Sequence, residues 1–361
     1  MIGRTLGLYL AARFTRSILG VFATIFILIY LIDFVEMLRK AGDVKSISTA
    51  GIAGLTLLRV PTVTEQVLPF VILGGAILAF VGLTRKLELV VARAAGVSVW
   101  QFLTPPVLIV VLIGLLSVGV YNPVAAMMKQ RADAIELSLF GRTGPSDADS
   151  SLWIRQRGAA GQSILRAEQS SDRGTKLGSI SAFVFDLENR FVERVDAARA
   201  TLEPGRWALD EARVMTPGAE ARSVAQYFLP TYLSADQVSQ SFVTADAVPF
   251  WSLPEVSART EAAGLDATAY RLKFQVLLAR PLLLVAMVLV AASFSLRFFR
   301  MGGVARMVSG GVAAGFVLYV VTKLVTDLGG AGILSAPVAA WAPAIVGSML
   351  GVLVLLHQED G

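Results

Sequence analysis

Long apolar runs occupy both ends of the chain, and a more polar middle separates them. A helix needs about 20 apolar residues to cross a bilayer, and several segments reach that length. The first follows three arginines but is too long for the core of a cleavable signal peptide, so we expect an uncleaved span. The six predicted spans cover residues 17–38, 66–83, 103–121, 274–296, 307–325 and 336–356.

The polar middle alternates apolar and polar residues with a period of two, which is typical of half-buried β-strands. Turn signals such as Pro204-Gly205 and Pro217-Gly218 separate the alternating segments. Many short strands at this spacing are typical of a sandwich or jelly roll. We expect strands at residues 151–157, 179–186, 191–195, 206–214 and 223–229, after a flexible linker at 141–151 and before a short helix that opens at the capping-box pattern 252–255.

Together the two patterns predict an α-helical membrane protein with six transmembrane helices and an inserted all-β, jelly-roll-like domain between helices 3 and 4. We expect three parts. Residues 1–128 hold transmembrane helices 1–3, residues 129–265 hold the β domain with its flanking linkers, and residues 266–361 hold transmembrane helices 4–6.

Lysine and arginine gather at the same end of successive predicted spans. Such clusters stay on the cytoplasmic side of a membrane. We therefore expect both termini in the cytoplasm and the β domain outside it. The residues that carry this bias are Arg4, Arg13, Arg16, Arg85, Lys86, Arg93, Arg297, Arg300 and Arg306.

Composition supports a membrane protein. Hydrophobic residues make up 55% of the chain and charged residues 16%, whereas a soluble domain carries about 25% charged residues. The formal net charge is +5, which on its own would be compatible with a nucleic-acid partner. We expect none, because the basic residues lie at the ends of apolar runs, where membrane topology explains them.

The sequence offers few residues for catalysis or metal binding. It has no cysteine, which excludes disulfides and thiolate metal sites, and its single histidine, His357, lies in the C-terminal tail. The phosphate-binding motif G-x-x-x-x-G-K-[ST] is absent, so the chain is not itself a P-loop ATPase. We expect no enzyme activity, cofactor or metal in this chain. The alternatives are a membrane enzyme acting on lipids and a scaffold whose external domain binds other proteins.

A short charged segment at residues 84–97, between the second and third spans, predicts an amphipathic helix at the membrane surface. Thr84 is a candidate cap, and Gly96 can supply the left-handed residue at the end. Leu89 is apolar on the charged side, so we expect it to project as an apolar knob. The face expected to pack on the chain's own spans consists of Leu87, Val90, Val91 and Ala94.

Two sets of residues near the outer ends of the spans each leave two interpretations open. The cations Arg39, Lys40, Lys129 and Arg131 are either ordinary surface charge or a rim that suits an acidic, phosphorylated lipid headgroup. The aromatic residues Phe22, Phe26, Tyr30, Phe316 and Tyr319 either pack between helices or line a cavity for acyl chains. Gly311 and Gly315 form a G-x-x-x-G pattern, which predicts a close helix–helix contact.

Several stretches, in this order and spacing, resemble the YjgP/YjgQ permease family, the membrane subunits of the lipopolysaccharide export transporter. Its two paralogous branches are LptF and LptG, and the first stretch is more similar to the LptG branch. Asp33 departs from the pattern, because relatives can carry a basic residue at about this depth. The stretches are D-F-V-E-M-L-R-K-A-G at 33–42, E-L-V-V-A-R-A-A-G at 88–96, Arg280-Pro281, Arg297, Arg300-Met301-Gly302 and G-F-V-L-Y at 315–319.

The resemblance implies a permease of the Gram-negative inner membrane, with its β domain in the periplasm. It implies a heterodimer with an LptF-like paralogue, a cytoplasmic LptB-like ATPase dimer that binds the ATP, an LptC-like periplasmic protein and lipopolysaccharide as the substrate. It also implies that the surface helix inserts into a groove of the ATPase. The corresponding coupling residues in this chain are Arg85, Glu88, Leu89, Arg93 and Gly96.

Overall fold

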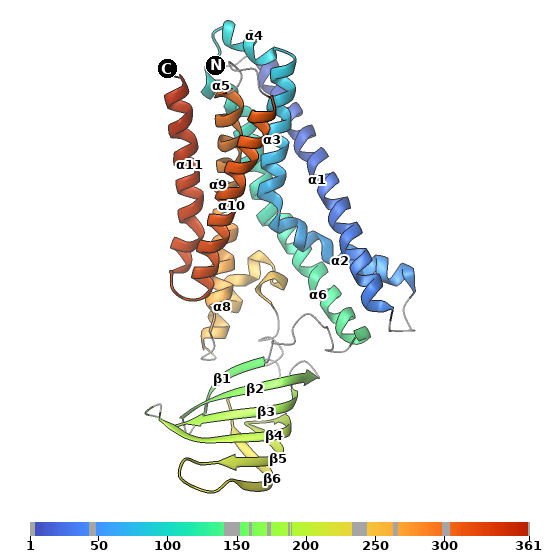
Figure 1. The fold of residues 1–361 in the computed structure, drawn as a ribbon, viewed down its shortest axis with the longest axis vertical. Helices are drawn as coiled ribbons and strands as arrows, with labels where there is room; N and C mark the ends of the chain where they lie inside the picture. Colours follow the sequence, from blue (N-terminus) through green and yellow to red (C-terminus); the bar gives the residue numbers. More distant parts are fainter. Residues whose placement is uncertain are drawn as a thin grey trace. The chain divides into compact units, whose positions relative to one another are not determined.

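The computed structural model describes residues 4–42, 48–140, 152–158, 161–171, 175–186, 188, 190–232, 244–262, 266–297 and 304–359. The chain divides into two compact units (Figure 1). The helical unit consists of Met1–Ala132, Val248–Pro254 and Thr268–Gly361, and the β unit consists of Asp133–Ala247 and Glu255–Ala267. The expected linker at 141–151 and the Arg300-Met301-Gly302 stretch lie outside the described residues.

Within the described residues, six long apolar helices of the helical unit can cross a membrane, as the sequence predicted. The third span is one continuous helix, because a π-helical segment, Ser117–Tyr121, joins α5 to α6 without a break. The helices that supply the spans are α1 (Arg4–Ala41), α3 (Leu68–Arg85), α5 (Val99–Leu116) with α6 (Asn122–Phe140), α9 (Thr268–Arg297), α10 (Val304–Gly330) and α11 (Ala336–Glu359).

The centre of the helical unit is α9, which packs against α3, α5, α10 and α11. Glycines allow the closest approaches. A Cβ on Gly114 of α5 would lie 2.8 Å from the Cα of Pro281 on α9. Gly311 and Gly315 of α10 contact Ile77 and Leu73 of α3, which confirms the helix–helix contact predicted from the G-x-x-x-G pattern.

The outer segment between the first and second spans contains a helix. Helix α2 (Thr49–Gln66) begins at Ser48, whose hydroxyl accepts from the Gly51 N–H at 3.1 Å. It continues through Pro61, which usually breaks a helix. The third span holds this turn in place, because the Pro61 carbonyl accepts from the Tyr121 hydroxyl at 3.0 Å. That support comes from a residue 60 positions along the chain, so the sequence around Pro61 does not show it.

The described strands of the β unit form one six-stranded antiparallel sheet in which every strand pairs with the next along the chain. This confirms the predicted all-β middle, although the sequence missed β2. It differs from a jelly roll, whose strands cross between two sheets. The strands are β1 (Leu152–Gly158), β2 (Gly161–Ser171), β3 (Lys176–Phe185), β4 (Phe191–Glu203), β5 (Arg206–Met215) and β6 (Arg222–Pro230), followed by the predicted short helix α8 (Leu253–Ala262).

This single sheet curls over its own apolar face. Gln156 of β1 accepts from the Trp207 ring N–H of β5 at 3.2 Å and from the Thr231 hydroxyl after β6 at 2.6 Å. The first strand therefore lies over the last two, with Trp207 fully buried between them. The β3–β4 ladder shifts its register between Val184 and Phe185. An irregularity of this kind increases local twist, which helps one sheet to enclose a core.

Candidate functional site

A short surface helix interrupts the path from the second span to the third. Helix α3 ends at Arg85, and Leu87 adopts the left-handed conformation with φ 57° before α4 (Glu88–Ala94) begins. Gly96, with φ 80°, follows α4. Ser98 then starts α5 with a reciprocal capping box to Gln101. Figure 1 places α4 at the same end of the helical unit as the start of α1 and the end of α11.

The exposed face of α4 differs from the sequence prediction. Leu89 is only 3% exposed, whereas Leu87 is 58% and Val91 67% exposed. The expectation that Leu89 projects as an apolar knob was therefore wrong, as was the expectation that Leu87 and Val91 pack on the spans. The physical reason is the left-handed Leu87, which reorients α4 so that it does not continue the helical register of Thr84.

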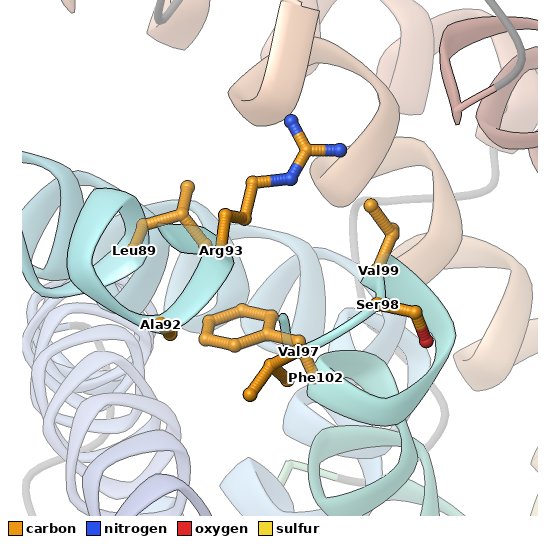
Figure 2. A pocket seen from close by; sticks show the side chains of 7 residues that line it. All are labelled: Leu89, Ala92, Arg93, Val97, Ser98, Val99 and Phe102. Carbon is orange, nitrogen blue, oxygen red and sulfur yellow. The ribbon is translucent and has the colours of Figure 1, made fainter. Parts of the chain in front are cut away.

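Leu89 and Phe102 contribute to a pocket between α4 and the start of α5 (Figure 2). The pocket has a cavity volume of about 10 Å³, far below the roughly 300 Å³ of the smallest small-molecule sites. In Figure 2 the Arg93 guanidinium extends away from Phe102. This end of the helical unit thus offers an outer surface of apolar and basic residues, which include the exposed Arg85, Ala94 and Gly96.

Glu88, at the start of α4, binds two residues of α1. The Tyr9 hydroxyl donates to the Glu88 carboxylate at 2.8 Å, and Arg13 pairs with the same carboxylate at 3.5 Å. Arg13 also donates to the Tyr9 hydroxyl at 2.8 Å, which closes a triangle. Sequence reasoning used Arg13 only as a marker of orientation and missed Tyr9. The sequence holds no signal for this contact, because 79 positions separate Tyr9 from Glu88.

The cations at the other end of α1 are partly paired. Lys40 contacts Glu36 one turn earlier at 2.9 Å, and Arg39 is exposed. Asp33 pairs with Arg59 of α2 at 3.5 Å. A cation therefore lies beside Asp33, but it comes from another helix, so the sequence around Asp33 does not show it. The two other predicted cations lie on α6, where Lys129 is half-buried and Arg131 is exposed.

The predicted aromatic residues form two groups, and α3 packs between the helices that carry them. On α1, the rings of Phe22 and Phe26 are 6.0 Å apart, and the Tyr30 hydroxyl donates to the Ala53 carbonyl at 3.4 Å. On α10, Tyr319 and the exposed Phe316 both contact Phe70 of α3, with centroid distances of 4.6 and 6.5 Å. The two groups thus lie on different edges of this chain.

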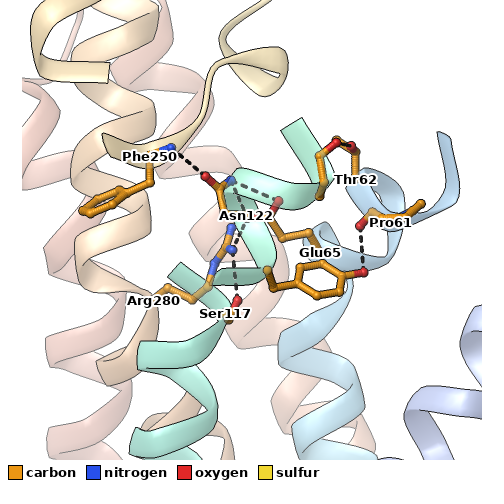
Figure 3. A network of polar contacts seen from close by, with 9 residues as sticks. Pro61, Thr62, Glu65, Ser117, Asn122, Phe250 and Arg280 are labelled. Carbon is orange, nitrogen blue, oxygen red and sulfur yellow. Dashed lines mark hydrogen bonds and ion pairs between the residues drawn. The ribbon is translucent and has the colours of Figure 1, made fainter. Parts of the chain in front are cut away.

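A buried polar network joins three helices of the unit (Figure 3). Arg280 of α9 forms an ion pair with Glu65 at the end of α2, and the two residues are 7% and 2% exposed. The Asn122 amide donates to both carboxylate oxygens of Glu65, at 3.0 and 3.1 Å. The Asn122 carbonyl accepts the Phe250 backbone N–H at 2.9 Å, which attaches the segment that leads into α8.

The sequence holds no signal for this network, because Glu65 lies 57 positions from Asn122 and 215 from Arg280. Buried ionisable groups within a membrane protein are typically paired, and Glu65 and Arg280 satisfy one another. The pair is therefore a structural clamp between helices. Within the residues that the structure describes, no group of histidine or carboxylate side chains is arranged to hold a metal ion.

Comparison with known proteins gives the same assignment along nearly the whole chain. The family described as "Lipopolysaccharide export system permease LptF/LptG" matches residues 8–357. The "Lipopolysaccharide export system permease protein LptG" of Escherichia coli (strain K12) is 29% identical over 314 residues, which cover 83% of this chain and 84% of that protein. The protein of the same name from Haemophilus influenzae (strain ATCC 51907 / DSM 11121 / KW20 / Rd) is 25% identical over 363 residues, which cover 94% of each. The chain is a multi-pass membrane protein that belongs to the lipopolysaccharide export permease family LptF/LptG.

Proposed function

We propose that this chain is the LptG-type permease subunit of an ABC transporter that extracts lipopolysaccharide from the outer leaflet of the inner membrane. ATP hydrolysis in an LptB-like dimer drives the extraction, and the lipid passes to a periplasmic bridge towards the outer membrane. The observation that carries the proposal is α4, an exposed apolar and basic helix at one end of six apolar helices. The relatives named LptG favour that branch over LptF.

The orientation follows from the positive-inside rule. Arg85, Lys86 and Arg93 flank or belong to α4, and Arg13 and Arg16 lie near the start of α1 at the same end. We place this end in the cytoplasm of a Gram-negative bacterium, with both termini. The segment 129–265, which holds the β unit, then lies in the periplasm, where an LptC-like protein would contact it.

The ATPase contact surface, as we propose it, consists of Leu87, Val91 and Ala94 with the neighbouring Arg85 and Arg93. All five side chains are exposed. Apolar side chains in a basic surround suit a groove that has an apolar floor and an acidic rim. Leu89, which the sequence suggested for this role, instead fixes α4 to α5 from within.

The lipid site, as we propose it, is completed by an LptF-like paralogue. The aromatic group of α1 and that of α10 lie on separate edges of this chain, so each edge would face the partner permease across a shared cavity for acyl chains. Arg39, Lys40, Lys129 and Arg131 would bind the phosphorylated headgroup above it, with Arg59 as an additional cation near Asp33.

Replacing Val91 by glutamate is expected to reduce co-purification of the partner ATPase at least about tenfold, because it places a carboxylate in an apolar groove with an acidic rim, where like charges cost several kcal/mol. Val91→Leu keeps the surface apolar and is the matched control. Leu89→Ala should instead lower thermal stability, because Leu89 is buried. Normal ATPase binding by the Val91→Glu variant would contradict the proposed docking surface. The measurement is pull-down in detergent with the wild-type chain in parallel.

Reversing the charge of both Arg39 and Lys40 is expected to impair lipid loading more than basal ATP hydrolysis. The physical reason is that charge-assisted hydrogen bonds to phosphate are lost, while the ATPase contact lies at the other end of α1. Loading is measured by photo-crosslinking of lipopolysaccharide to the complex, and hydrolysis is measured by phosphate release. Equal loss of both activities would argue against a headgroup role and indicate damage to the fold.

A further inference from the structure

The triangle of Tyr9, Arg13 and Glu88 lies between helices and is partly shielded from solvent, unlike an ordinary surface ion pair. Arg13 lies where α1, α3 and α4 meet. A Cβ on Gly82 of α3 would be 2.6 Å from the Arg13 guanidinium, so a larger residue there would displace the guanidinium. The side chains of Arg13 and Glu88 are 21% and 30% exposed. This partial shielding strengthens a charge-assisted pair relative to one in open water.

Few side chains of α4 hold it to the rest of the helical unit. Leu89 is the buried residue of this helix. Within the described residues, Glu88 is the α4 side chain that forms hydrogen bonds or an ion pair, and both of its partners lie on α1. The left-handed Leu87 separates α4 from α3. A displacement of α4 is therefore not carried by a continuous helix, and the Glu88 contact joins it to the first span.

The first half of α1 transmits such a displacement to α3 as well. Leu10, Phe14 and Ile18 form a buried stripe on it. The Phe14 ring meets the Phe80 ring of α3 edge-on at 5.0 Å. Beyond this stripe, large apolar side chains of α1 such as Ile27 and Ile32 are exposed. The start of α1 is thus held against α3, while its outer half packs on α2 through the buried Met37 and the Asp33–Arg59 pair.

We propose that Tyr9 and Arg13 are positioning residues that hold Glu88 and so connect α4 to the first span, which makes α1 move when a partner pushes α4. This inference rests on the proposed function. It gives Glu88 a role within the chain, because its carboxylate binds Tyr9 and Arg13 of α1.

Exchanging the charges of Arg13 and Glu88 tests whether Glu88 acts through its contact with α1 or through a contact with the ATPase. The variants are Arg13→Glu, Glu88→Arg and the double exchange, with Tyr9→Phe to remove the hydroxyl and Arg16→Glu as a matched control. Arg16 is an exposed cation on the same helix. Each variant is assembled with the partner permease and ATPase in proteoliposomes. Three quantities are measured: ATPase bound, ATP hydrolysed and lipopolysaccharide released per ATP.

Each single exchange is expected to lower lipid release per ATP about tenfold with the ATPase still bound, because a hydrogen bond to a charged group is worth about that factor. The double exchange should recover most of the release, Tyr9→Phe should lose part of it, and Arg16→Glu should resemble wild type. The inference would be overturned if the double variant released as little lipid per ATP as Glu88→Arg. It would also be overturned if Glu88→Arg lost ATPase binding and the added Arg13→Glu exchange did not restore it.

A second measurement does not depend on the proposed function. In the purified full chain, each single exchange should lower the unfolding midpoint, because it places two like charges at the contact. The double exchange should restore the midpoint, because the charges are again opposite. Additive loss in the double variant would overturn the contact. If the contact passes this test but wild-type complexes neither bind an ATPase nor release lipid, the proposed function fails instead.

Discussion

Replacing Arg280 by methionine is expected to destabilise the folded chain by about 3–5 kcal/mol, because it leaves the Glu65 carboxylate buried without its cation. Glu65 is only 2% exposed. The Asn122 amide would remain hydrogen-bonded to Glu65 but cannot neutralise its charge. The expected result is a lower unfolding midpoint in detergent and a smaller monodisperse fraction in size-exclusion chromatography.

A matched control uses an exposed ion pair of the same unit. Lys323 pairs with Asp327 one turn later at 2.9 Å, and the two side chains are 62% and 57% exposed. Lys323→Met should cost about 1 kcal/mol at most. The double variant Glu65→Leu/Arg280→Met should recover stability, because it removes both buried charges and not one. Equal midpoints for Arg280→Met and Lys323→Met would show that the Glu65–Arg280 pair does not clamp the helices.

Replacing Gly75 by leucine is expected to separate α1 from α3 and to abolish ATP-driven lipid release. A Cβ at this position would lie 2.7 Å from the Ile18 Cα. A backbone atom cannot move aside as a side chain can, so the helices must move apart. Overpacking of this kind costs about 1–3 kcal/mol. Because the proposed coupling runs from α4 through the start of α1, the loss of release should exceed the loss of stability.

The neighbouring glycine gives the control for this variant. A Cβ on Gly74 would meet the Val21 side chain at 3.5 Å, an ordinary contact. Gly74→Ala should leave the midpoint unchanged or raise it slightly, because alanine favours a helix. Release of lipid and the unfolding midpoint are measured for both variants. If Gly75→Leu matched Gly74→Ala in both measurements, the α1–α3 contact would not be needed for coupling.

The sequence predicted the helical unit more closely than the β unit. The six spans were predicted closely, because hydrocarbon thickness sets the length of each apolar run. Strand β2 was missed, since its alternation is weak in G-Q-S-I-L-R-A-E-Q-S-S. The jelly-roll expectation rested on strand spacing, which does not fix which strands pair. The curl that brings Gln156 over Trp207 depends on contacts between strands distant in the chain.

At the candidate site, too, the sequence predicted one feature correctly and another wrongly. Residues 84–97 were recognised as a surface segment, because a short charged stretch between two spans has no other place to lie. The side of α4 that faces outwards was not recognised, because one backbone conformation at Leu87 decides it. A helical wheel assumes a continuous helix, and a leucine in the left-handed region is too rare to expect. Leu89 and Val91 consequently exchanged roles.

The sequence by itself determined that the chain is a six-span membrane protein with a β insertion, because apolar length and period are local properties. It also determined the family, through short stretches at fixed spacing. Only the tertiary structure decided the partners of the charges. Arg280 and Glu65 are 215 positions apart, and Glu88 meets Arg13 through a break in a helix. The sequence shows which residues are charged, but the packing of the helices decides which oppositely charged residue each one pairs with.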